Sequence, residues 1–181
     1  MPSSAVSPDN YIIGKGKVYF KPEGETDFRD LGNAPEVEFT PELEELEHNS
    51  SREGVRVRDR TVIIEKSAEI RLVLEEFTLE NLAMAMIGDI DENGGDQVLN
   101  IFSQNAIRGE LRIWMTNEIG PRFDVEFPSV SFQPSGSLGF ITDEWGQMEL
   151  TGNVEVSNGT FGTMTPLESS APAEPDFGGE T

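Results

Sequence analysis

Glu69–Gly88, "EIRLVLEEFTLENLAMAMIG", contains the two patterns that predict the fold. In its first half, apolar and polar residues alternate, and Ile70, Leu72 and Leu74 point to the same side of an extended chain. This two-residue period is typical of a strand with one face buried and one face in water. The stretch therefore predicts a strand of a sheet that is solvated on one side, which is the usual condition of antiparallel sheets.

The second half of the stretch, Thr78–Gly88, changes to the period of a helix. Thr78 is a suitable N-cap, Glu80 suits the first turn, and Gly88 suits the C-terminal cap. The helix is predicted to bury one apolar stripe: Leu79, Leu82, Ala83, Met86 and Ile87. No other part of the chain has so clear a helical pattern.

Strand patterns account for most of the remaining chain. They occur at Tyr11–Lys21, Glu36–Thr40, Gly109–Met115, Arg122–Phe127 and Gln147–Val156. The sequence thus predicts a mainly β, mostly antiparallel domain over residues 11–165, with the helix covering a face or an end of a sheet. Residues 1–10 are predicted to be a flexible N-terminal arm. Residues 166–181 hold three prolines and four acidic residues and are predicted to be a disordered acidic tail.

Composition limits the functions that the chain could have. Its 181 residues suffice for one domain with a real core, and the absence of cysteine removes disulfide and thiol chemistry. No apolar run approaches the roughly 18 residues that span a membrane, and the N-terminus lacks the pattern of a signal peptide. The net charge of −21 argues against gripping nucleic acid through its phosphates.

Catalytic and metal-binding patterns are weak. His48 is the single histidine, and no P-loop or G-x-S-x-G motif occurs, so we expect neither an enzyme nor a cofactor. Residues 89–94, "DIDENG", match the start of an EF-hand loop. The twelfth position is Asn100 in place of the bidentate glutamate, so a polar turn is expected there and no metal site is assigned.

Charge is unevenly placed along the chain. Residues 52–71 contain six basic and four acidic residues (6 − 4 = +2), whereas residues 1–51 sum to 4 − 11 = −7 and residues 72–181 to 3 − 19 = −16. The basic part begins with "REGVRVRDR", Arg52–Arg60, just after the acidic block Glu36–His48. Two interpretations stay open: a solvated hairpin with local ion pairs, or a projecting arm that docks on an acidic surface of another copy.

The run Gly14–Asp89 resembles the tail tube (major tail) proteins of long-tailed bacteriophages. The resemblance lies in "DLGN" before a short strand, "ELEHNSSREG" opening a charged arm, "FTLENLAMAM" as the helix, and "EWGQMELTGNVEV" as a closing strand. It implies an antiparallel β-sandwich with one flanking α-helix and a long projecting loop or hairpin arm, here near residues 48–66. It also implies a structural virion protein whose hexameric rings stack into a hollow tube that conducts genomic DNA into the host.

Two groups of site residues follow from this resemblance. The first would join subunits and rings through the arm: Arg52, Arg56, Arg58, Arg60, Lys66, Glu42, Glu44, Glu45 and Glu47. The second would line the lumen and repel DNA phosphates: Glu69, Glu75, Glu110, Asp124, Glu126, Glu149 and Glu155. Only part of the second group is expected to face the lumen, because some of these strands must face outward. The arm is expected to order only when it docks.

The implied partners are further copies of the chain and the tape measure and tail-end proteins of the same virion. Double-stranded DNA would pass through the lumen without specific binding, and the tube would be assembled in the host bacterial cytoplasm as part of the virion tail. Two alternatives remain open. One is a tube or ring protein of a contractile injection or secretion machine, and the other is a monomeric β-sandwich that binds a ligand or a host surface.

Overall fold

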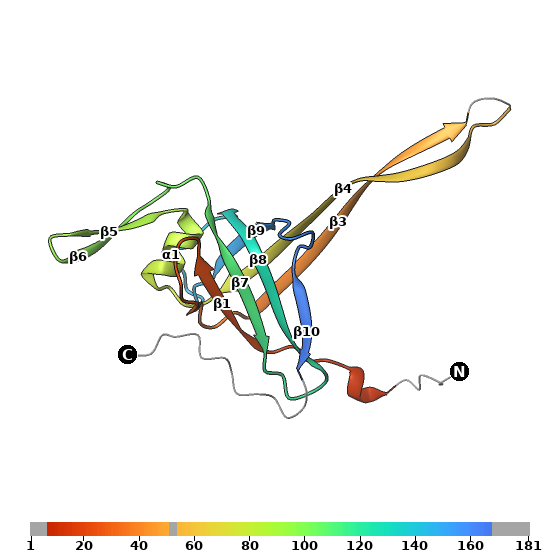
Figure 1. Ribbon diagram of the computed structural model, residues 1–181. Helices are drawn as coiled ribbons and strands as arrows, with labels where there is room; N and C mark the ends of the chain where they lie inside the picture. Colours follow the sequence, from red (N-terminus) through yellow and green to blue (C-terminus); the bar gives the residue numbers. More distant parts are fainter. Residues whose placement is uncertain (1–6, 51–53, 168–181) are drawn as a thin grey trace.

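A computed structural model describes residues 7–50 and 54–167 of the chain (Figure 1). Ten strands and one α-helix form its regular structure. They are β1 (Gly16–Pro22), β2 (Arg29–Asp30), β3 (Glu36–Ser50), β4 (Val57–Leu74), α1 (Leu79–Met86), β5 (Asp89–Asn93), β6 (Asp96–Asn100), β7 (Ile107–Met115), β8 (Arg122–Pro134), β9 (Met148–Val154) and β10 (Thr163–Leu167), after a short 3-10 turn at Pro8–Asn10. The fold is mainly β and antiparallel, as the sequence predicted.

Strand β8 connects two layers of sheet. The strand order is β2-β1-β7-β8-β9-β4-β3, and every pairing is antiparallel. One edge of β8 pairs with β7, whereas its other edge pairs with β10 over Arg122–Glu126 and with β9 over Val130–Pro134. Pro128 lies between these two halves and has no N–H to donate. The sheet consequently bends at β8, so that its two parts pack as the two layers of a sandwich-like arrangement (Figure 1).

The core lies between the two layers. Phe20 and Phe132 are fully buried and meet edge to face with ring centroids 5.4 Å apart, and Phe39 stacks on Phe127 at 5.3 Å. The predicted alternation in β4 is confirmed on its inner side, because Ile70, Leu72 and Leu74 are completely buried. Other buried core residues are Val18, Leu31, Leu111, Val130, Met148 and Leu150. Val73, which was predicted to face outward with the charged residues, is also buried.

Helix α1 begins as predicted and ends differently. The Asn81 N–H donates to the Thr78 hydroxyl at 3.2 Å, so Thr78 is the N-cap. The left-handed residue at the C-terminus is Ile87, with φ +47°, and not Gly88. Complete burial of the Ile87 side chain offsets the strain of this conformation. The buried face is also shifted from the predicted stripe, because Asn81 and Met84 point inward while Leu79 and Met86 are half-buried.

The predicted segment bounds need several corrections. The first strand begins at Gly16 rather than Tyr11, and Tyr11–Ile13 is exposed. The strand expected at Glu36–Thr40 continues to Ser50, because Pro41 lies on an edge strand where no N–H is needed. Strand β10 extends to Leu167, two residues beyond the predicted domain end; residues 168–181 lie outside the described part, as do residues 1–6 of the predicted N-terminal arm.

The EF-hand-like stretch is a hairpin. Asp89–Asn93 is extended and pairs with Asp96–Asn100, and the turn is formed by Gly94 and Gly95, both with positive φ. The Asn100 side-chain amide donates to Asp91 Oδ2 at 2.7 Å across the hairpin. An extended strand does not curl its oxygens around an ion as the calcium loop requires. Within residues 7–50 and 54–167, no group of three or more His, Asp or Glu is placed to hold a metal ion.

Candidate assembly surfaces

Strands β3 and β4 continue past the sandwich as a two-stranded hairpin, which we call the arm (residues 42–50 and 57–67). Ala68 is the last buried residue of β4 before the arm, and none of the described arm residues is buried. Figure 1 shows the arm reaching well away from the two layers. The arm was predicted to span residues 48–66; it begins nearer the body because both strands stay paired from Glu42–Ser67 to Ser50–Val57.

Two bulges shape the arm. The register shifts between Glu44 and Glu45, which leaves Ile64 as an extra residue on β4, and again between His48 and Asn49, which leaves Asp59 extra. Bulges bend a strand and increase its twist. They also change which β4 side chains share a face with those of β3. Apolar side chains are exposed on both faces of the arm, because Leu43 and Leu46 are three residues apart on β3 and Val62 and Ile63 are adjacent on β4.

Two pairs of ionisable side chains meet within the arm. Arg58 forms an ion pair with Glu47, and His48 Nδ1 lies 2.6 Å from Asp59 Oδ1. Glu47 was predicted to receive arginines from another copy, and within one chain it pairs with Arg58 of the same hairpin. Arg56 and Arg60 are exposed, and Arg52 lies outside the described residues. Because Glu42, Glu44, Glu45 and Lys66 are exposed, they remain accessible to a partner.

The arm is not the purely polar element that its arginines and glutamates suggested. Six large aliphatic side chains on it are between 44% and 64% exposed: Leu43, Leu46, Val57, Val62, Ile63 and Ile64. Leu46 and Val62 lie directly opposite each other. A two-stranded hairpin is marginally stable alone, and such a concentration of exposed apolar side chains is typical of an interaction site. The arm therefore has the properties of a segment that packs on a partner.

The outer face of the β3-β4-β9 layer is strongly acidic. Register pairs place seven carboxylates on this side: Glu36, Glu38, Glu42, Glu44, Glu65, Glu69 and Glu149. Glu155, which follows β9, is the eighth and lies 3.6 Å from Arg108. Arg71 and Arg108 are the basic residues on the same side, so the formal charge of this face is 2 − 8 = −6. We call this surface the acidic face. It continues from the body onto the first part of the arm.

Arg71 is at the centre of the acidic face. Its guanidinium lies 2.9 Å from Glu36, 3.2 Å from Glu38 and 2.9 Å from Glu149, so one cation bridges three strands. The hydrogen bond from Arg71 lowers the pKa of Glu149, and the bonds with Glu149 and Glu36 raise the pKa of Arg71. Glu149 therefore stays ionised to a lower pH than an isolated glutamate.

The outer face of the other layer has balanced charge. Four basic and four acidic residues share it (4 − 4 = 0): Lys17, Lys21, Arg112, Arg122, Asp30, Glu110, Asp124 and Glu126. Arg112 donates to both oxygens of Asp124, with Nε 2.8 Å from Oδ1, and Lys21 Nζ lies 2.8 Å from Glu110. Nearly buried Asp124 therefore serves the packing of this layer.

The structure divides the predicted lumen residues between the two faces. Glu69, Glu149 and Glu155 lie on the acidic face, whereas Glu110, Asp124 and Glu126 lie on the balanced face among basic partners. Glu75 lies just after β4 and accepts a hydrogen bond from the Gln147 side chain at 3.0 Å. Sequence reasoning did not place Glu36, Glu38 and Glu65 in this group. The strict alternation of Glu36–Leu43 was the signal for the first two.

Among the described residues, no helix has the length and apolar character needed to cross a membrane. A search of curated proteins found no match to the chain. Residues 11–111, which are 101 of 181, match a family described as "Protein of unknown function UCP028589". Because the match covers more than half of the chain, this protein belongs to that family.

Proposed function

We propose that this protein is a structural subunit that assembles with copies of itself into a hollow tube, namely the tail tube of a long-tailed bacteriophage. The observation that carries the proposal is the arm. It projects from a β-sandwich, has no buried residue among those described, and exposes aliphatic side chains on both faces. An element of this kind gains stability when it packs on another subunit.

The acidic face supports the second part of the proposal, which is that the tube conducts DNA. A channel wall with many carboxylates repels phosphates, whereas a basic wall would bind DNA at every turn and slow its passage. The formal charge of the acidic face is −6 and that of the balanced face is 0. The acidic face therefore suits the lumen, and the balanced face suits the exterior. The lumen group is accordingly revised to Glu36, Glu38, Glu42, Glu65, Glu69, Glu149 and Glu155.

The assembly has to overcome a net charge of −21 per chain. Repulsion between copies keeps a free chain soluble. The arm reduces this barrier, because its arginines can approach carboxylates of the next copy while its aliphatic side chains leave water. We therefore expect the purified protein to be mostly monomeric when dilute and to polymerise at high concentration or on a template.

Negative-stain electron microscopy of the purified protein, over a range of concentration and salt, tests the proposal. Hollow rings or tubes of uniform diameter are the expected result. Uniform particles of about 20 kDa at every concentration would refute self-assembly and favour the monomeric binding module. A contractile sheath around the tubes in the parent particle would instead favour the contractile machine. A variant that lacks residues 42–67 is the matched control, because it should stay monomeric.

A further inference from the structure

The sandwich has an unfilled apolar cavity at one open side. Strand β3 ends the sheet order and β10 pairs only with β8, so the facing edges of β3 and β10 leave a gap. The gap is a cavity of about 830 Å³. Its walls are mainly apolar, and Val37, Ile113, Phe127 and Phe161 are among the lining residues. Two lysines, Lys15 and Lys66, also line it.

The loop between β8 and β9 has the opposite property. Its residues Phe140, Ile141 and Trp145 are 74%, 98% and 93% exposed, which places three large apolar side chains in water on one short segment. Asp143 and Glu144 lie between them in sequence. We call residues 139–145 the plug. Side chains of this size gain free energy when they leave water, so a contact with a partner that buries them would be stabilised.

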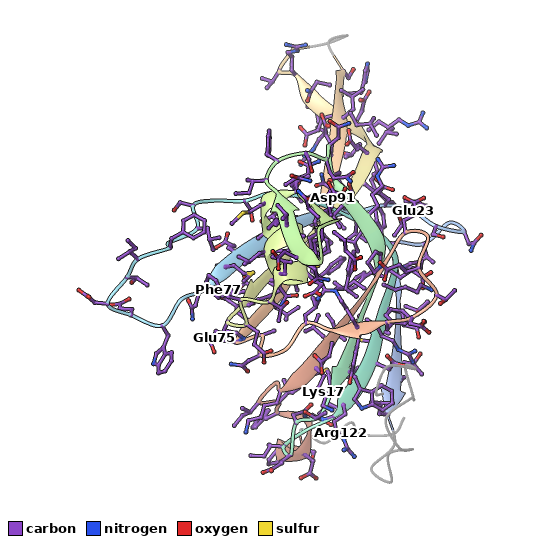
Figure 2. All side chains as sticks on the ribbon, turned by 90° about the vertical axis from the view of Figure 1, so that its left-hand side faces the viewer. Lys17, Glu23, Glu75, Phe77, Asp91 and Arg122 are labelled. Atoms are coloured by element: carbon purple, nitrogen blue, oxygen red, sulfur yellow. The ribbon has the colours of Figure 1, made fainter. Side chains whose placement is uncertain are left out.

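Contacts at the base of the loop fix it to the body, so the plug projects in a defined direction. The Gln147 side chain donates to Glu75 at 3.0 Å, the Ser135 hydroxyl donates to the Glu149 carbonyl at 2.9 Å, and Gly146 lies against the Phe77 ring. Figure 2 shows the loop projecting from the body beside Phe77. Lys17 lies on a different side of the molecule, and its neighbours Gly16 and Val18 line the cavity. The plug of one chain therefore does not fill its own cavity.

We infer that the plug of one copy inserts into the β3–β10 cavity of a neighbouring copy. The cavity is mainly apolar and large enough for a few side chains. Glu36 and Glu38 also line it but are paired with Arg71, which leaves Lys15 and Lys66 to meet Asp143 and Glu144 of the plug. A plug and a cavity on different sides of the same chain make a heterologous contact, which generates rings or open chains of subunits. The inference deepens the proposed tube, because it names a second subunit contact beside the arm.

Cysteine cross-linking tests the contact directly, because the natural chain contains no cysteine. Gly139 begins the plug and Gly14 lines the cavity; a Cβ at either position meets nothing within 4 Å, and neither has positive φ. Mixed Gly139→Cys and Gly14→Cys chains, treated with a short bismaleimide, are expected to give a cross-linked heterodimer. The control is a mixture of Gly139→Cys with Asn153→Cys, which lies on the acidic face. This mixture should give little cross-linked heterodimer. Equal yields for the two mixtures would overturn the inference.

Fluorescence gives an independent readout. Trp114 is 6% exposed and Trp145 is 93% exposed, so the difference between the spectra of the natural chain and Trp145→Phe reports Trp145. The emission of Trp145 should shift to the blue as concentration rises. Met164→Glu, which puts a charge on an exposed lining residue, should weaken this association at least tenfold, whereas Val156→Glu, at an equally exposed apolar site outside the cavity lining, should not.

These measurements separate the inference from the proposed function. Tubes in which Trp145 stays exposed and the cross-link does not form would refute the plug and leave the tube proposal standing. A specific cross-link with a blue shift, in a protein that never forms rings or tubes, would support the plug and refute the tube. Uniform monomers with an exposed Trp145 at the highest soluble concentration would refute both.

Discussion

The side-chain amide of Asn81 donates to the main-chain carbonyl of Leu31 at 2.9 Å and thereby joins helix α1 to the turn after β2. The same nitrogen donates to the Glu76 carbonyl at 3.0 Å, and Asn81 Oδ1 accepts from Arg29 at 2.6 Å. Asn81 is 1% exposed and Leu31 is completely buried. The "DLGN" turn, Asp30–Asn33, thus has a structural role, because it anchors the helix to the sandwich.

Replacing Asn81 with alanine should destabilise the monomer by about 1–3 kcal/mol, because the buried Leu31 carbonyl and the partly buried Glu76 carbonyl lose their donor. Urea unfolding followed by circular dichroism measures the change. Asn153→Ala, at an exposed position of β9, should change stability little and is the control. Equal stability of the two variants would contradict the role given to Asn81.

The Arg112–Asp124 pair should matter more than the other ion pairs of its face. Asp124→Ala removes the carboxylate that accepts two hydrogen bonds from the half-buried Arg112 guanidinium, so a loss of about 1.5–3 kcal/mol is expected. Glu110→Ala breaks the more exposed pair with Lys21 and should cost ~0–1 kcal/mol. Thermal melts of both variants give the comparison. A larger loss of stability for Glu110→Ala than for Asp124→Ala would show that burial does not determine which ion pair contributes more.

The lowered pKa of Glu149 predicts how its contribution depends on pH. A carboxyl whose pKa is lower in the folded state than its ordinary value of 4.5 stabilises the fold above that value, and the contribution is lost as pH falls through the lowered pKa. Glu149→Gln should therefore be less stable than the natural chain at pH 7, and the difference should shrink as the pH falls below 4.5. Urea midpoints across this range test the prediction, which fails if the difference is constant with pH.

The exposed cross-strand pair of the arm should affect assembly and not folding. Leu46→Ser with Val62→Ser removes aliphatic side chains that are 61% and 44% exposed, so the melting temperature of the monomer should stay within about 2 °C of the natural value. The concentration needed for polymerisation, measured by light scattering, should rise at least tenfold. Val156→Ser, exposed outside the arm, should leave that concentration unchanged.

Reversing charge on the arm should block stacking while the sandwich stays folded. Arg56→Glu, just before β4, with Arg58→Glu and Arg60→Glu on the arm, changes the charge of this region by six units, and the intramolecular pair that these substitutions break is exposed and worth little. Electron microscopy should show no tubes, with an unchanged circular dichroism spectrum. Arg→Lys at the same three positions keeps the charge and should still polymerise, more weakly if bidentate pairing matters. Normal tubes from the glutamate variant would remove the arginines from the docking mechanism.

Periodicity was sufficient to predict the mainly β class, the inner face of β4 and the Thr78 cap, because each depends on neighbours a few residues apart. It was insufficient for β3, where Pro41 and the many glutamates masked a long edge strand. It also missed Ile64 and Asp59 as bulged residues, because a bulge depends on the partner strand as well as on the local sequence.

The sequence by itself determined the strand and helix patterns, the lack of cysteine and the separation of acidic from basic segments along the chain. Only the tertiary structure decided which carboxylates share a face. Glu149 and Glu36 are far apart in sequence, yet both reach Arg71, because antiparallel pairing sets β9 and β3 on either side of β4. Strand register is a property of pairs of strands, so the acidic face, the arm and the cavity could be located only after the strands had been paired.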